Sequence, residues 1–251
     1  MTLRWNVIAF DLDNTLFSHE DAFQCAIKGC YERFLKRNQM TKKVSSDEFF
    51  SVFKQQCDTY WPEFESKELT KIAYRRKRFI KTMELLSLPA SEEEADRFHR
   101  DYDDTVDDYS EPYPELTETL QYLDEQGVMV AVITNGKHET QLDKLRKIGA
   151  LEWIPKENVF ISDEVGIAKP DPGIFQYAEK LLAPSGESRL FVGDSWEHDV
   201  VGAIDAGWEA IYLNTRGTHP STNHQPLKQF THFEALSSWI RDHIHGQRGH
   251  Y

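Results

Sequence analysis

The stretch Trp5 to Thr15, WNVIAFDLDNT, decides the predicted fold. Its first six residues are mostly apolar, which predicts a short strand buried on both faces, as in a parallel sheet. The strand gives way to a polar loop that begins with Asp11-Leu12-Asp13. Because side chains alternate along an extended chain, the carboxylates of Asp11 and Asp13 should point to the same side at the carboxyl end of this strand.

Strand-like and helix-like segments alternate from residue 115 onward. Glycines follow several of the helical segments, where a helix commonly ends. Alternation of this kind predicts an α/β fold with a doubly wound, Rossmann-like parallel sheet. The predicted strands are 128–133, 158–161, 189–192 and 210–213, and the predicted helices are 115–126, 137–148, 172–182, 197–206 and 233–244.

A segment of different character separates the first strand from this alternating part. Its charges are dense and its apolar residues recur at helical spacing. Capping boxes at Ser45 and Ser91 mark two helix starts, and Pro112 and Pro114 interrupt the helical pattern after it. We therefore predict an inserted all-helical domain of about four helices, residues 18–109, within an α/β core made of residues 1–17 and 110–251.

The composition narrows the classes of partner. Of the 251 residues, 39% are hydrophobic and 28% are charged, which is typical of a folded globular protein. The net charge of −13 argues against nucleic acid polymers and anionic membranes as partners. The longest apolar run, Val128 to Ile133, is far shorter than the ~18 residues of a membrane-spanning helix, and the first residues lack a signal-peptide pattern. We therefore expect a cytoplasmic protein with no membrane partner.

Polar residues gather where the predicted strands end. In doubly wound sheets, ligands bind beyond the carboxyl ends of the strands, so one crevice should hold them all. These residues are Asp11, Asp13, Thr134, Asn135, Lys169, Asp194 and Asp199. Close carboxylates repel each other unless a cation lies between them or one keeps its proton, and Mg²⁺ binds both carboxylates and phosphate oxygens. Taken singly, the same residues also fit a solvated turn, a helix cap or a surface lysine.

Four motifs in order resemble those of the haloacid dehalogenase-like (HAD) hydrolases. They are Asp11-Leu12-Asp13-Asn14-Thr15-Leu16, Thr134-Asn135-Gly136, Lys169-Pro170, and Gly193-Asp194-Ser195 with Asp199. The flanking stretches 162–172 and 202–207 are also similar to that family, so the resemblance covers the whole core. The helical insertion is similar to the small helical cap (C1 type) of the family.

The resemblance implies a role for each of these residues. Asp11 would be the nucleophile that forms an aspartyl phosphate, and Asp13 would protonate the leaving oxygen and later activate water. Thr134, Asn135 and Lys169 would hold the phosphoryl oxygens. Mg²⁺ would be held by the carboxylates of Asp11 and Asp194 and the main-chain carbonyl of Asp13, with Asp199 in or next to that shell.

The function implied is a Mg²⁺-dependent phosphatase that acts on a small phosphorylated metabolite, a nucleoside monophosphate or a sugar phosphate. The first motif and the cap size resemble those of pyrimidine 5′-nucleotidases and acylneuraminate 9-phosphatases. Family members that dehalogenate lack an acid at the position of Asp13, because a halide leaving group needs no proton, so Asp13 favours phosphate transfer.

Three alternatives stay open at this point. The first is a phosphomutase of the same family, and the second is a phosphoryl-binding module without turnover. The third is a GDS-type serine esterase, which rests on Gly193-Asp194-Ser195 and on Asp242-His243-Ile244-His245. The sequence carries no signal for the oligomeric state.

Overall fold

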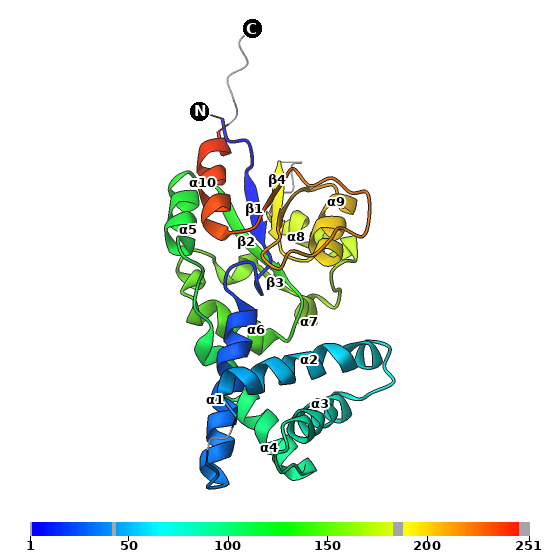
Figure 1. The fold of residues 1–251 in the computed structure, drawn as a ribbon. Coiled ribbons are helices and arrows are strands. Elements are labelled where there is room, and N and C mark those ends of the chain that lie inside the picture. Colours follow the sequence, from blue (N-terminus) through cyan, green and yellow to red (C-terminus); the bar gives the residue numbers. More distant parts are fainter. Residues whose placement is uncertain (1, 42–43, 183–187, 246–251) are drawn as a thin grey trace. The chain divides into compact units, whose positions relative to one another are not determined.

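The computed structural model describes residues 2–41, 44–182 and 188–245 (Figure 1). The chain forms two compact units. An α/β unit comprises Met1–His19 and Ser110–Tyr251, and a helical unit comprises Glu20–Tyr109.

Six strands form one parallel sheet in the described part of the α/β unit, in the order β3-β2-β1-β4-β5-β6. Their bounds are β1 Val7–Phe10, β2 Met129–Thr134, β3 Val159–Ile161, β4 Arg189–Gly193, β5 Glu209–Leu213 and β6 Lys228–Phe230. Phe10, the last residue of β1, pairs with Val132 of β2 and Val192 of β4. The carboxyl ends of these three central strands therefore meet at one edge, which confirms the predicted doubly wound α/β core.

Helices cover both faces of this sheet. Val7 and Ala9 of β1 pack in one apolar cluster with residues of α8 and α9, so the alternate residues of the strand face the other side. There α5 lies against α10, with Thr119 Oγ1 2.7 Å from Ser237 Oγ (Figure 1). The helices are α5 Leu116–Glu125, α6 His138–Lys147, α7 Ser162–Val165, α8 Pro172–Leu182, α9 Gly202–Asp205 and α10 Phe233–His243. Short 3₁₀ turns cover Ala150–Glu152 and Lys156–Asn158.

Several elements differ from the prediction, and one of them is the short helix α7, which was not predicted. The edge strand β6 was not predicted, because Lys228-Gln229-Phe230 is short and partly exposed and shows no apolar run. The helix predicted at 197–206 is instead a π-helical turn, Trp196–Val201, followed by α9. Within this turn the main-chain N–H of Ser195 donates to Asp199 Oδ2 at 2.9 Å, a contact that periodicity alone cannot indicate.

The helical unit has its own apolar core. Ser45 Oγ accepts a hydrogen bond from the Glu48 N–H at 3.1 Å, and Ser91 Oγ accepts one from the Glu94 N–H at 3.1 Å, so the hydroxyl half of each predicted capping box is present. The bounds are α1 His19–Arg37, α2 Ser46–Glu65, α3 Lys71–Leu85 and α4 Glu92–Asp103, with a 3₁₀ turn at Val106–Tyr109. The core includes the buried rings of Phe34, Phe49, Phe53, Phe79 and Phe98.

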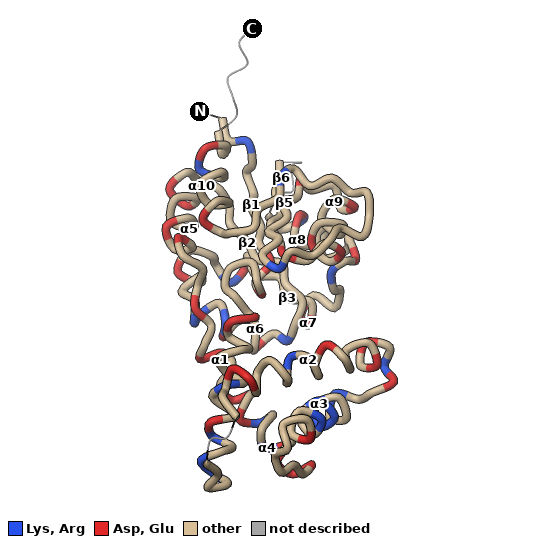
Figure 2. Tube along the Cα trace, in the orientation of Figure 1, with Lys and Arg blue, Asp and Glu red and all other residues tan. Residues whose placement is uncertain are grey.

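Helix α3 carries several basic residues, whose positions along the chain are blue in Figure 2. Most are paired within the unit: Arg75 with Asp103, Arg76 with Asp96, and Lys77 with Glu63, at 2.6 to 2.7 Å. Among the described residues, no helix is both long and apolar enough to cross a membrane.

Candidate active site

Three carboxylates meet at the carboxyl edge of the sheet. Asp11 follows β1, Asp194 follows β4, and Asp199 lies in the π-helical turn. An oxygen of each lies within 4.8 Å of the others, and all three residues are buried. Of the four predicted metal-binding residues, only the side chain of Asp13 lies outside this group.

Lys169 is the cation inside this cluster. Its Nζ lies 2.7 Å from Asp11 Oδ1 and 2.6 Å from Asp199 Oδ1, and the residue is only 4% exposed. The side chain of Asn135 makes two hydrogen bonds with the backbone of Lys169. The Asn135 Nδ2 donates to the Lys169 carbonyl at 2.9 Å, and the Lys169 N–H donates to Asn135 Oδ1 at 2.9 Å. Asn135 thus fixes the lysine backbone, and its direct contact with a phosphoryl oxygen stays a prediction.

Gly193 makes room for the carboxylate of Asp199. A Cβ atom at position 193 would lie 2.5 Å from the Cβ of Asp199, a distance that real Cβ contacts do not reach. Any side chain at Gly193 would therefore push the π-helical turn away from β4. The lack of space beside Asp199 thus explains why the fourth motif has a glycine at this position.

The cluster holds more negative charge than its neighbours balance. Burial raises the pKa of Asp11 to about 7, and repulsion from Asp199 adds to the effect, while Lys169 opposes it. Burial also raises the pKa of Asp194 to about 8, against the attraction of Arg216, whose Nη2 donates to Asp194 Oδ2 at 2.5 Å. The pKa of Lys169 is raised, because the two carboxylates it contacts outweigh the cost of burying its charge.

A divalent cation fits this donor set. Carboxylate oxygens are the ligands that Mg²⁺ prefers in proteins, and three of them lie within reach of a single ion. A bound cation would also relieve the repulsion that raises the pKa values of Asp11 and Asp194. The residues present therefore fit a divalent cation such as Mg²⁺.

The carboxylate of Asp13 turns toward α6. Lys144 Nζ lies 2.8 and 3.1 Å from its two oxygens, Gln141 Nε2 donates to it at 3.0 Å, and His19 Nδ1 lies 3.5 Å away. Burial would raise the pKa of Asp13, but Lys144 and His19 outweigh burial and hold it below its usual value. At neutral pH, Asp13 is therefore ionised in this structure.

Gln141, Lys144 and Arg216 were not predicted from the sequence. Polar residues in a helix or loop are usually solvated, so none of them stood out. Gln141 and Lys144 are three apart on α6, and therefore share one face of the helix that follows Thr134. This spacing, on a helix that directly follows a strand end of the site, was the sequence signal that could have identified the two residues.

The second motif is engaged in local hydrogen bonds. Thr134, the last residue of β2, accepts a hydrogen bond at Oγ1 from Gln141 Nε2 at 2.9 Å. The Gly136 N–H donates to Ser162 Oγ at 3.1 Å. Thr134 is buried and ends the strand next to β1, so it lies at the carboxyl edge of the sheet.

The esterase interpretation is wrong. Ser195 follows the carboxyl end of β4, whereas His245 forms a bridge with Leu3, before the amino end of β1. The Arg4 N–H also donates to the Ile244 carbonyl at 2.8 Å. Because β1 and β4 are parallel neighbours, the serine and the histidine block lie at opposite ends of the sheet.

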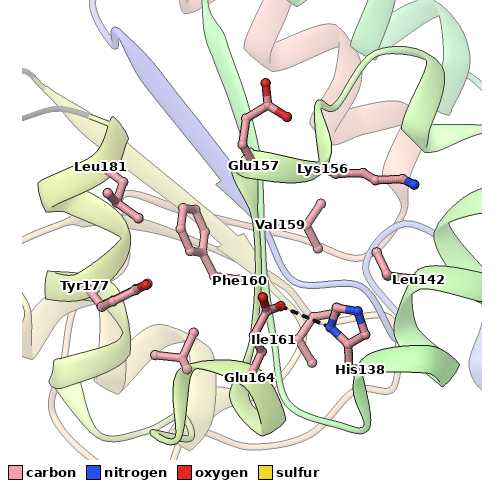
Figure 3. Close-up of a pocket in the computed structure, with 11 residues that line it drawn as sticks. His138, Leu142, Lys156, Glu157, Val159, Phe160, Ile161, Glu164, Tyr177 and Leu181 are labelled. Carbon is pink, nitrogen blue, oxygen red and sulfur yellow. Dashed lines mark hydrogen bonds and ion pairs between the residues drawn. The ribbon is translucent and has the colours of Figure 1, made fainter.

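A separate cavity of about 420 Å³ lies beside the edge strand β3. Figure 3 shows its apolar floor around Phe160 and the hydrogen bond between His138 Nδ1 and Glu164 Oε2, which measures 3.0 Å. None of the predicted site residues lines it. This cavity is therefore separate from the acidic cluster.

Comparison with known proteins identifies relatives over most of the chain. Residues 5–207 match the family model of haloacid dehalogenase-like hydrolases. Pyrimidine 5′-nucleotidase YjjG of Escherichia coli is 26% identical over 213 residues, which cover 84% of this chain and 87% of that protein. Glyceraldehyde 3-phosphate phosphatase of Pyrococcus furiosus is 26% identical over 210 residues, 84% of this chain and 81% of that protein.

Solved structures show the same fold. The HAD hydrolase YfnB of Bacillus subtilis, bound to magnesium, superposes with a TM-score of 0.72 at 20% identity. The match covers 94% of this chain and 99% of that one.

Proposed function

Since the chain belongs to the haloacid dehalogenase-like hydrolases, we propose that it is a phosphoric monoester hydrolase that uses Mg²⁺ and acts on a small phosphorylated metabolite. The observation that carries the proposal is the buried cluster of Asp11, Asp194 and Asp199 around Lys169. Relatives named as a pyrimidine 5′-nucleotidase and a glyceraldehyde 3-phosphate phosphatase support a nucleoside monophosphate or a sugar phosphate as substrate.

In the first step, a carboxylate oxygen of Asp11 attacks the phosphorus atom and forms an aspartyl phosphate. The bond between phosphorus and the leaving oxygen breaks, and its electron pair stays on that oxygen. Asp13, which is ionised in the free protein, would take up a proton when the anionic phosphate binds beside it, because a neighbouring negative charge raises the pKa of a carboxyl group. It would then donate that proton to the leaving alcohol.

In the second step, water attacks the phosphorus atom of the aspartyl phosphate and the bond to Asp11 breaks. The carboxylate of Asp13 accepts the proton from water. Lys144 and His19 favour the ionised form of Asp13, which is the form this step requires. Asp13 returns this proton to solvent once phosphate leaves, because its pKa in the free protein lies below its usual value.

Positive charge around the phosphoryl group supplies the remaining stabilisation. Lys169 and Thr134 would hold phosphoryl oxygens, with Asn135 fixing the backbone of Lys169. Mg²⁺ would be held by the carboxylates of Asp11 and Asp194 and the main-chain carbonyl of Asp13, with Asp199 in or next to that shell. When bound, the ion neutralises charge on the phosphoryl oxygens.

We further propose that residues 18–109 are the cap domain of this family. The compact helical unit Glu20–Tyr109, with its own apolar core, supports this assignment. A cap that excludes water around a substrate would favour an enzyme over a binding module.

The test is phosphate release from a panel of nucleoside monophosphates, sugar phosphates and phosphoglycolate, with Mg²⁺ and with a chelator. We expect release from at least one class, lost in chelator and restored by Mg²⁺, and absent in an Asp11→Asn variant purified in parallel. Full activity in chelator would contradict the proposal. Conversion of a monoester into its isomer without phosphate release would indicate a mutase, and binding without turnover would indicate a phosphoryl-binding module.

A further inference from the structure

Two side chains of α6 converge on the carboxylate of Asp13. Lys144 contacts both of its oxygens, at 2.8 and 3.1 Å, and Gln141 Nε2 donates to one of them at 3.0 Å. The two residues lie one helical turn apart, so a single helix face holds the group.

Both Gln141 and Lys144 are buried. Gln141 is 2% exposed and Lys144 is 7% exposed. Burying an ammonium group is costly unless it is paired, and among the described residues Asp13 is the carboxylate that pairs with Lys144. The Lys144 Nζ also lies 5.9 Å from the centre of the Phe17 ring, in the loop that carries Asp13.

Gln141 joins Asp13 to the second motif. The same Nε2 lies 2.9 Å from Thr134 Oγ1 and 3.1 Å from the Asn135 carbonyl. The close approach needs a glycine, because a Cβ at Gly136 would lie 2.9 Å from Gln141 Cδ, and the φ angle of Gly136 is +148°. The amide thus ties the proposed acid and base to the hydroxyl that would hold a phosphoryl oxygen.

We propose that Gln141 and Lys144 are positioning residues for the phosphoryl-transfer reaction, which set the orientation of the Asp13 carboxylate relative to the leaving oxygen. The inference rests on the proposed role of Asp13. It assigns neither residue a contact with the substrate. Substitution of either residue should therefore slow only those reactions in which Asp13 must protonate the leaving group.

The leaving group separates this role from a structural one. An alkoxide is strongly basic and leaves only when it is protonated, whereas p-nitrophenoxide leaves without a proton. Loss of Asp13 should therefore lower kcat/KM for an alkyl phosphate much more than for p-nitrophenyl phosphate. A variant that acts through Asp13 should show the same selectivity.

The experiment compares kcat/KM for an alkyl phosphate substrate and for p-nitrophenyl phosphate, with Mg²⁺ present. The variants are Lys144→Met, Lys144→Arg, Gln141→Met and Asp13→Asn, with Arg146→Met as a matched control that removes an exposed ion pair from the same helix. We expect Lys144→Met to lower kcat/KM for the alkyl ester on the order of 10- to 100-fold more than for the aryl ester, a part of the roughly 10² to 10⁴ that general acid catalysis contributes. Lys144→Arg should recover part of the loss, and Gln141→Met should show a smaller loss of the same kind.

A double variant completes the test. In the Asp13→Asn background, Lys144→Met should cause no further loss, because both changes remove the same function. Equal losses for the two esters, additive losses in the double variant, or an unchanged or higher rate in Lys144→Met would overturn the inference while leaving the phosphatase proposal in place. If Asp13→Asn lowered kcat/KM for the alkyl and the aryl ester by the same factor, that result would instead contradict the proposed role of Asp13 itself. Thermal unfolding of each variant checks that it folds. If Lys144→Met does not fold, Lys144→Arg and Gln141→Met carry the test in its place.

Discussion

Raising the pH should destabilise the metal-free protein, and Mg²⁺ should cancel that effect. The pKa of Asp11 is about 7 and that of Asp194 about 8 in the folded chain, against 3.8 for a free carboxyl group. The folded state therefore keeps protons that the unfolded state has released. Stability from these groups is complete below about pH 4 and is lost as the pH rises through 7 to 8.

The size of the effect follows from the number of protons. Because the two carboxyl groups interact, we count one proton per molecule, which gives a slope of about 1.4 kcal/mol per pH unit. From about pH 5 to about pH 7 the free energy of unfolding should fall by roughly 3 kcal/mol. For a unit of this size that corresponds to a fall in Tm of about 6 to 12 °C.

The assay is thermal unfolding across this pH range, in chelator and in Mg²⁺. An Asp194→Asn variant removes one of the two groups, and Asp163→Asn changes an exposed carboxylate that pairs with Lys137 and serves as the control. The quantity compared is the difference in Tm between parent and variant. We expect the difference to change with pH in chelator for Asp194→Asn and to stay constant for Asp163→Asn. Two results would refute the reasoning. One is a difference in Tm between parent and Asp194→Asn that does not change with pH in chelator, and the other is an Asp194→Asn variant that Mg²⁺ stabilises as much as the parent.

Three further predictions concern single positions. Gly193→Ala should force Asp199 to move by about 1 Å and lower kcat/KM on the order of 10²-fold, measured as phosphate release; a rate near that of the parent would contradict the steric argument. Burial lowers the pKa of His99 to about 3, so the helical unit should lose stability as the pH falls below about 6.5, and His99→Phe should flatten that pH dependence in thermal unfolding. Ser91→Ala should lower the free energy of unfolding by about 1 kcal/mol in denaturant titration, and no change would mean that the cap contact contributes nothing.

Most of the fold was predictable because apolar periodicity reports which elements are buried. The short apolar runs before Asp11 and Asp194 predicted the strands that bring these residues to one edge. The edge strand β6 gave no such signal, because an edge strand of three partly exposed residues needs no apolar run. The π-helical turn at Asp199 includes a side-chain contact with the Ser195 N–H, which spacing alone does not reveal.

The candidate site was predictable where several motifs agreed and not where one side chain acts alone. Asp11, Lys169, Asp194 and Asp199 meet as the order of the motifs indicated. The two residues of α6 that hold Asp13 were missed, because a lysine and a glutamine in a charged helix normally face solvent. Only tertiary packing buries them.

The measurement that tests the central claim most directly is the location of the phosphoryl group after the reaction with substrate and Mg²⁺ is quenched in acid. The account predicts one phosphoryl group on the peptide that contains Asp11 in the parent protein. The Asp11→Asn protein should carry none and should release no phosphate. A phosphoryl group on any other residue, or continued phosphate release by Asp11→Asn, would contradict the claim that Asp11 is the nucleophile.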